Sequence, residues 1–237
     1  EAEVLVLGKQ TSDIAQEAAS IPGVGKVWAV EHDLLERYSP EGYVKALSDF
    51  LKAQAPHYVL FPHTYQVRDF APRLATRFNQ TLVSDVTGIR AEGGNVTFVR
   101  QLFQGKLNGD YRVEAALPAF ASLQAGAFQA IEPAAASAAV EIFTPELDAG
   151  QIGSEAEEPF RESQRTVDLS AAPIIVSVGR GIQDQQNIAL VEELAKALGA
   201  ELAASRPICD SGWLPMERQV GSSRQTVAPK PHIAVGT

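Results

Sequence analysis

The sequence is poor in cysteine and histidine. Its 237 residues contain one cysteine, Cys209, which excludes an internal disulfide framework and suits a reducing compartment. We expect this thiol to be a small buried apolar group rather than a nucleophile. The histidines show neither HxxxH spacing nor adjacent carboxylate clusters, so we expect no metal centre. They are His32, His57, His63 and His232.

Basic residues and long apolar runs are also scarce. Lys and Arg number 20 against 29 Asp and Glu, and the net charge of −9 argues against binding nucleic acid or an anionic membrane surface. No apolar run approaches the roughly 20 residues that cross a bilayer, and no signal-like start is visible. With 45% hydrophobic residues, a chain of this size can bury the cores of two modest domains.

The first 143 residues alternate strand and helix patterns and then gather strand patterns. Strands are expected at 3–8, 27–30, 58–61, 82–89, 96–100, 111–115 and 119–123. Helices are expected from Thr11-Ser12-Asp13 to Pro22-Gly23, over 39–54 and over 68–78. Strands separated by helices imply right-handed crossovers, while the later strands imply antiparallel pairing. We therefore predict an α/β domain over residues 1–143, mostly parallel with antiparallel edge strands.

The remaining chain divides into a polar segment and a second domain. Residues 144–170 have few large apolar side chains and several glutamates, which predicts an exposed linker. Residues 171–237 predict a partial doubly wound domain. Its first strand is Pro173 to Val178, and the helix that follows ends at Gly199.

Three loops of this second domain combine arginine, hydroxyl groups and glycine. The first, Gly179-Arg180-Gly181, lies between a strand and a helix, where helix N–H groups and the Arg180 guanidinium attract phosphate. This turn alone is a weak signal because it lacks the six-residue dinucleotide fingerprint. The other loops are Ala204-Ser205-Arg206 and Gln219-Val220-Gly221-Ser222-Ser223. Together the three loops suit an anionic, planar cofactor.

In their order and spacing these loops resemble the C-terminal domain of the alpha subunit of electron transfer flavoproteins. That domain carries a GGRG-type turn after a strand, an Ala-Ser-Arg segment and a Gln-Val-Gly-x-Ser/Thr loop, and the matching stretch here runs from about Ile174 to Thr237. The resemblance continues more loosely over 71–75 and 83–86. We expect the chain to lack the family's first strand and helix, and also its Ser-Gly-x-x-Gln-His loop with the later part of the FAD site.

The resemblance implies an FAD cofactor and a set of residues that contact it. Arg206 would lie against the flavin ring and favour an anionic reduced form, while the Ser223 hydroxyl would donate toward the reactive ring nitrogen. Where many members have Gln and Gly around that hydroxyl, this chain has Ser222 and Arg224. The implied cofactor-binding residues are Arg180, Ser205, Arg206, Gln219, Val220, Gly221, Ser222 and Ser223.

The residues themselves leave other roles open at four of these positions. Arg206 could form a surface salt bridge with a carboxylate, and Ser205 could cap a local turn. Ser222 and Ser223 could be ordinary turn hydroxyls.

The function that this resemblance implies is electron carriage rather than enzymatic catalysis. FAD would be reduced by a flavoprotein dehydrogenase and reoxidised by an acceptor such as a membrane quinone oxidoreductase, with a beta subunit completing a heterodimer. The implied location is the bacterial cytoplasm, or the mitochondrial matrix in a eukaryote. The alternative is a truncated or diverged alpha-subunit module that binds a partner without flavin. A weaker third possibility is a nucleotide-binding hydrolase built on the first domain, although Pro62-His63-Thr64 matches no recognised phosphate loop.

Overall fold

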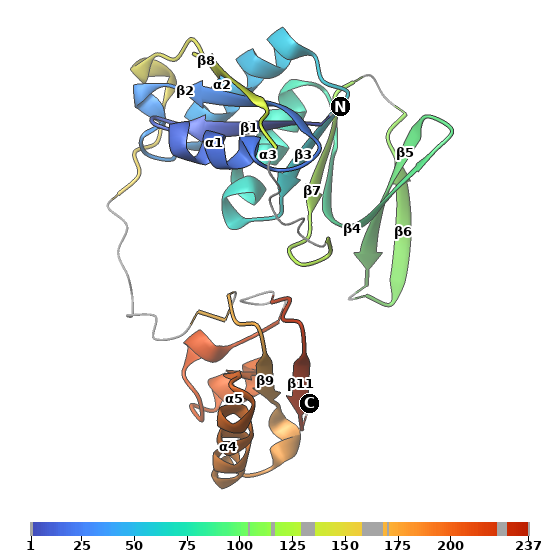
Figure 1. Cartoon of the computed structure of the whole chain (residues 1–237), viewed down its shortest axis with the longest axis vertical. Helices are drawn as coiled ribbons and strands as arrows, with labels where there is room; N and C mark the ends of the chain where they lie inside the picture. The colour runs from blue at the N-terminus through green and yellow to red at the C-terminus, as the bar shows by residue number, and fades with distance from the viewer. Residues whose placement is uncertain are drawn as a thin grey trace. The chain divides into compact units, whose positions relative to one another are not determined.

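The chain folds as two compact units, residues 1–158 and 159–237, in a computed structural model. The structure describes residues 2–103, 105–114, 117–128, 136–157, 168–169, 171–221 and 227–236. Both units combine strands with helices, which confirms the predicted α/β class (Figure 1).

The first unit contains two groups of hydrogen-bonded strands. One is a parallel sheet in the order β1 (Ala2–Gly8), β2 (Val24–Glu31) and β8 (Ala139–Phe143). The other has the order β3-β7-β4-β5-β6, parallel from β3 to β4 and antiparallel from β4 to β6. Its strands are β3 (Tyr58–Pro62), β7 (Ala119–Leu123), β4 (Leu82–Glu92), β5 (Asn95–Leu102) and β6 (Leu107–Arg112). Figure 1 shows β5 and β6 as a long hairpin that continues from β4.

The helices of the first unit cover its strands with apolar faces. They are α1 (Ser12–Ala19), α2 (Pro40–Gln54) and α3 (Tyr65–Arg77). Helix α2 begins as its sequence predicts, because Ser39 caps it by accepting the Gly42 N–H and Pro40 occupies the first turn. One buried cluster joins α2 and α3 to strands of both sheets; it includes Trp28, Phe50, Phe70, Leu74 and Phe120.

Several elements of the first unit differ from the sequence predictions. Strand β8 was not predicted, and it pairs in parallel with β2. Helix α3 begins at Tyr65, three residues before the predicted start, because the Thr64 hydroxyl caps it by accepting the Val67 N–H. Thr11 does not cap α1 with its hydroxyl; both its N–H and its hydroxyl donate to Glu31 at 2.8 Å.

The segment after β8 differs from the expected exposed linker where the structure describes it. Pro145 is buried, and Leu147 packs against the main core of the first unit. Farther along, the Ser154 hydroxyl donates to Glu41 at 2.6 Å, and Arg37 donates to the Ala156 carbonyl. The start of this segment therefore belongs physically to the first unit, while a linker over the whole of residues 144–170 stays a prediction.

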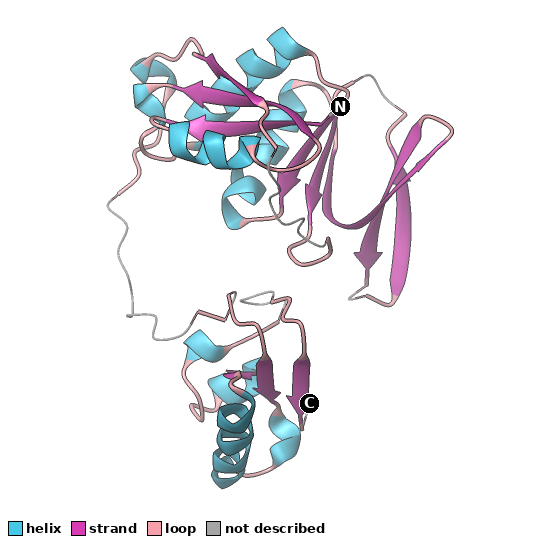
Figure 2. Cartoon of the chain, in the orientation of Figure 1, coloured by secondary structure: helices cyan, strands magenta, loops and turns pink. Residues whose placement is uncertain are grey.

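The second unit is a parallel sheet in the order β10-β9-β11. Its elements are β9 (Ile175–Val178), α4 (Ile188–Leu198), β10 (Glu201–Ala204), α5 (Arg206–Asp210) and β11 (His232–Val235). Helix α4 packs beside the sheet through Ile188, Val191 and Ala195 (Figure 2). Gly199 ends it in the left-handed conformation, as predicted, with φ of 61°.

Candidate functional site

The carboxyl ends of the three strands in the second unit bring several of the predicted residues together. Ser205 follows β10, and its N–H donates to Val178, the last residue of β9, at 2.9 Å. Val220 donates to the Ala204 carbonyl at 2.9 Å, so the Gln219 loop lies beside the same strand end. In open α/β sheets this edge is where ligands bind.

The turn after β9 is fixed by close contact between two glycines. The Gly181 N–H donates to the Gly236 carbonyl at 2.6 Å, and Gly179 donates to Val235 at 2.9 Å. A Cβ on Gly181 would lie 2.7 Å from the Gly236 oxygen, which is closer than real side chains allow. These two positions therefore require glycine, and the bonded turn presents Arg180 at the strand ends.

The geometry around Arg180 differs from a simple strand–turn–helix phosphate site. Arg180 begins a short 3-10 turn over Arg180–Ile182, whereas helix α4 does not begin until Ile188. The Gly181 N–H is already bonded to Gly236, so it is not free for phosphate. At this turn the group available to attract phosphate is therefore mainly the exposed Arg180 side chain.

Ser205 carries a buried hydroxyl without a hydrogen-bond partner among the described residues. It precedes α5, yet its side chain makes no capping bond there, so the capping role considered from sequence does not apply. A buried polar atom left unpaired costs roughly 1–3 kcal/mol, and such atoms call for a partner from outside the protein. This hydroxyl fits a ligand that supplies a polar group at the strand ends.

Arg206 forms the surface ion pair that the sequence left open. Its Nε lies 3.2 Å from Asp210, one turn along α5, and the two side chains are 65% and 51% exposed. An exposed pair of this kind contributes only about 0–1 kcal/mol, so its geometry does not lock the guanidinium in place. Arg206 is thus a cation at the strand ends that a bound anion could attract.

The loop at Gln219 completes the described part of this edge. Gln219 is 1% exposed, and Gly221 has a φ of 126°, which favours glycine. Ser222 and Ser223, also expected to bind the cofactor, lie outside the described residues. The structure thus brings Arg180, Ser205, Arg206, Gln219 and Val220 to neighbouring strand ends.

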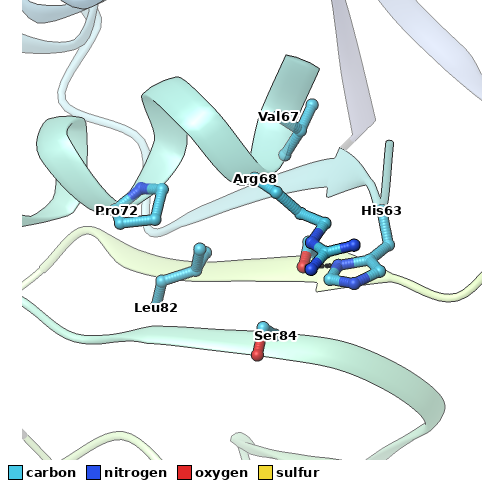
Figure 3. Close-up of a pocket in the computed structure, with 7 residues that line it drawn as sticks. His63, Val67, Arg68, Pro72, Leu82 and Ser84 are labelled. Atoms are coloured by element: carbon cyan, nitrogen blue, oxygen red, sulfur yellow. Dashed lines mark hydrogen bonds between the residues drawn. The ribbon is translucent and has the colours of Figure 1, made fainter. Parts of the chain in front are cut away.

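A second polar site lies in the first unit, where the sequence contains no recognised motif around Pro62-His63-Thr64. A pocket of about 180 Å³ is formed at the ends of β3 and β7, beside α3 and β4 (Figure 3). Its lining residues are His63, Val67, Arg68, Pro72, Leu82, Ser84 and Ser122. A possible signal was the position of His63 and Ser122 near the ends of two expected strands, although the strand at 119–123 was expected to pair antiparallel and in fact pairs in parallel with β3.

His63 and Ser122 form the polar floor of this pocket. The two side chains are hydrogen-bonded at 2.9 Å, and the Asp85 N–H donates to the same Ser122 oxygen at 3.2 Å. The register of β4 against β7 shifts between Val83 and Val86, and Asp85 has a φ of 60°. This irregularity brings the Asp85 carboxylate to 3.9 Å from His63 Nε2.

These three residues resemble a serine hydrolase triad only in composition. Ser122 is 1% exposed and its oxygen already accepts an N–H, while the Asp85 carboxylate is too far from the imidazole for a hydrogen bond. Burial lowers the pKa of His63 below its usual 6.5. Arg68 and Arg100 lower it further, against the opposing effect of Asp85. The imidazole is therefore neutral near pH 7.

Two other features are absent among the described residues. No group of three or more His, Cys, Asp or Glu side chains there is arranged to hold a metal ion. In the same part of the chain no helix has the length and apolar character needed to span a membrane.

Comparison with known proteins agrees with the geometry of the second unit. Residues 1–148 match the model of the electron transfer flavoprotein domain, and residues 168–237 match that of the electron transfer flavoprotein FAD-binding domain.

Individual bacterial relatives cover nearly all of the chain. The electron transfer flavoprotein subunit alpha of Thermoanaerobacterium thermosaccharolyticum is 32% identical over 98% of this chain and 71% of its own length. The subunit of the same name from Bacillus subtilis is 32% identical over 98% of this chain and 70% of its own length. Protein FixB of Azotobacter vinelandii is 35% identical over 90% of this chain and 61% of its own length. On this evidence, the chain belongs to the electron transfer flavoprotein alpha subunit family.

Proposed function

We propose that this protein carries electrons by means of FAD held at the carboxyl ends of β9 and β10. The observation that supports this most directly is the buried Ser205 hydroxyl, which lacks a partner among the described residues. It lies beside an exposed arginine and the Gln219 loop, within the stretch that matches an FAD-binding domain. These residues fit a cofactor that combines a diphosphate with a polar ring system.

Each residue of this edge has a distinct part in the proposal. Arg180 would hold the diphosphate, because its exposed guanidinium presents a fork of donors to phosphate oxygens. Ser205 and the Gln219–Gly221 backbone would hold the polar edge of the ring system. Ser223, outside the described residues, keeps the hydrogen-bonding role that the resemblance implies. When bound, FAD supplies the electron-transfer chemistry itself.

Arg206 would set how readily electrons are accepted. A fixed positive charge near a group that gains negative charge lowers the energy of the reduced state, and the effect is strongest where water is excluded. The ion pair with Asp210 holds Arg206 only weakly in its present position. Arg206 can therefore turn from Asp210 toward a cofactor at small energetic cost.

The proposed partners are proteins rather than small substrates. We propose a beta subunit that completes the cofactor site, a flavoprotein dehydrogenase as electron donor, and an acceptor such as a membrane quinone oxidoreductase. The relatives reported above are bacterial, so we propose a bacterial cytoplasmic location. The match of residues 168–237 to an FAD-binding domain favours the carrier over a flavin-free interaction module.

The visible absorption spectrum tests this proposal. The chain is purified alone and with a co-expressed electron transfer flavoprotein beta subunit, and each sample is scanned from about 300 to 550 nm. Flavin bands near about 375 and 450 nm are expected at least in the complex. A stable complex without these bands would favour the flavin-free module.

A further inference from the structure

The pocket in the first unit combines a polar floor with an apolar wall. His63, Ser84 and Ser122 supply ring nitrogens and hydroxyls. Val67, Pro72 and Leu82 supply the apolar side. At about 180 Å³ the pocket is smaller than the roughly 300–1,000 Å³ of sites for drug-sized ligands. Its size and lining suit a small molecule or a single polar group of a larger one.

Arg68 gives this pocket an available cation. Figure 3 shows its side chain extending from α3 toward the imidazole of His63. Its guanidinium lies over the ring of Tyr65, whose centroid is 5.5 Å away, and it forms no ion pair with any residue that the structure describes. A guanidinium carries five N–H donors in a planar fork that matches carboxylate and phosphate oxygens. Arg68 therefore lacks the acceptor that its geometry is suited to bind.

Charges around the pocket add to this positive character. Arg100 on β5 is close enough to act on His63, and its Nε is buried without a hydrogen-bond partner among the described residues. Asp85 is the opposing charge, with a side chain that is 39% exposed and therefore partly screened by water. The pocket also lies against the first turn of α3, at the positive end of that helix. Two arginines and a helix N-terminus thus lie near this pocket, opposed by the Asp85 carboxylate.

We propose that this pocket binds a small oxyanion, either phosphate or carboxylate, at the Arg68 guanidinium beside the imidazole of His63 (Figure 3). The guanidinium supplies the paired N–H donors. Val67, Pro72 and Leu82 accommodate an apolar group carried by the anion. This site is independent of the FAD proposal, because it lies wholly within the first unit.

Nuclear magnetic resonance of the histidine rings provides the test. The full chain contains four histidines, so the ring signals of His63 can be assigned from a His63→Gln variant. Sodium phosphate, and separately sodium acetate, is titrated at pH 7 and constant ionic strength with chloride as the replaced ion. The proposal expects a saturable shift of the His63 signals with at least one anion and little change at His32, His57 and His232.

Matched variants of α3 separate a specific site from general charge attraction. Arg68→Gln should weaken binding about tenfold by removing the forked donor, while Arg68→Lys should weaken it less. Arg77→Gln, which removes an exposed charge at the other end of the same helix, should leave binding unchanged. The ring signals of His32, His57 and His232, compared with those of the parent, report whether each variant is folded. The absence of a saturable shift with either anion, or equal binding by the Arg68→Gln and Arg77→Gln variants, overturns the proposal.

Discussion

The two units present polar groups at the carboxyl ends of parallel strands, but they satisfy those groups differently. In the first unit the Ser122 hydroxyl is bonded to His63 and also accepts the Asp85 N–H. In the second unit the Ser205 hydroxyl has no partner among the described residues. The Ser122 hydroxyl therefore has its hydrogen-bond partners without a ligand. The strand ends of the second unit instead leave a buried polar atom, the Ser205 hydroxyl, unpaired among the described residues. The difference indicates that the second edge depends more strongly on a bound molecule.

The two tryptophans allow the units to be followed separately. Trp28 belongs to the core of the first unit, and Trp213 packs against the core of the second. Fluorescence in a Trp28→Phe or Trp213→Phe background therefore reports one unit at a time.

The largest expected effect is the loss of packing in the first unit. Leu74 is fully buried among α2, α3 and the sheet, so Leu74→Ala should lower the free energy of unfolding by about 3 kcal/mol. Leu60, on β3, is 47% exposed, and Leu60→Ala should lower it by less than about 1 kcal/mol. Urea unfolding followed by Trp28 fluorescence measures both. Equal losses at the two positions would contradict the assigned core.

The next effect concerns the glycine contact that fixes the cofactor edge. Gly181→Ala should destabilise the second unit by about 2 kcal/mol, because the added Cβ meets the backbone of Gly236 on a rigid strand end. Gly199→Ala has open space but a left-handed φ of 61°, so about 1 kcal/mol is expected there. Unfolding followed by Trp213 fluorescence compares them. A smaller loss at Gly181 than at Gly199 would show that the turn adjusts freely.

A smaller effect distinguishes the hydroxyls of Ser177 and Ser205 in the second unit. Ser177 bonds to His232 at 2.9 Å and is buried, so Ser177→Ala should cost about 1 kcal/mol of stability. Ser205→Ala should not lower stability, since it removes an unpaired atom, but should lower the flavin-to-protein ratio of the complex with a beta subunit. Absorbance and urea unfolding measure the two quantities. Full flavin retention by Ser205→Ala would remove that hydroxyl from the site.

The smallest expected effect is a pH dependence in the first unit. Burial, Arg68 and Arg100 keep the pKa of His63 below 6.5 despite Asp85. The unfolded chain therefore binds a proton first as pH falls. The contribution of this group to stability is fully present above about pH 6.5 and is lost as pH falls toward the folded pKa. The difference in unfolding free energy between pH 7.5 and 5.5 should be smaller in His63→Gln than in the parent. An NMR titration that gives His63 a pKa above 6.5 in the folded protein would contradict the predicted direction of this pH dependence.

The sequence predicted the second unit's edge better because its chemistry lies in short contiguous motifs. Arg180 lies within a Gly-Arg-Gly turn, and Ser205 with Arg206 directly follows a strand pattern. The neighbouring residues in the sequence were therefore sufficient to predict that these side chains lie at strand ends. The sequence could not decide between a cofactor contact and a salt bridge for Arg206, because Asp210 becomes a neighbour only when α5 forms.

The first unit's pocket was missed because its residues are distant in the chain. His63, Arg68, Ser84 and Ser122 meet only after β3, β4 and β7 pair, and the shift of register in β4 has no clear sequence signal. The spacing of Val191, Leu194, Ala195 and Leu198 predicts one buried stripe on the helix of the second unit, and this prediction is only partly right. Ala195 is buried, but Leu194 and Leu198 are 39% and 41% exposed, since periodicity predicts a face but not how much of it is covered.

The most direct test of the FAD proposal is the affinity of the complex for FAD. Equilibrium titration, followed by flavin fluorescence, compares the parent with Arg180→Gln and with the control Arg77→Gln, each bound to an electron transfer flavoprotein beta subunit. Saturable binding by the parent, weakened about tenfold in Arg180→Gln and unchanged in Arg77→Gln, is the predicted result. Absence of binding by the parent, or the same affinity in both variants, would contradict the proposed site.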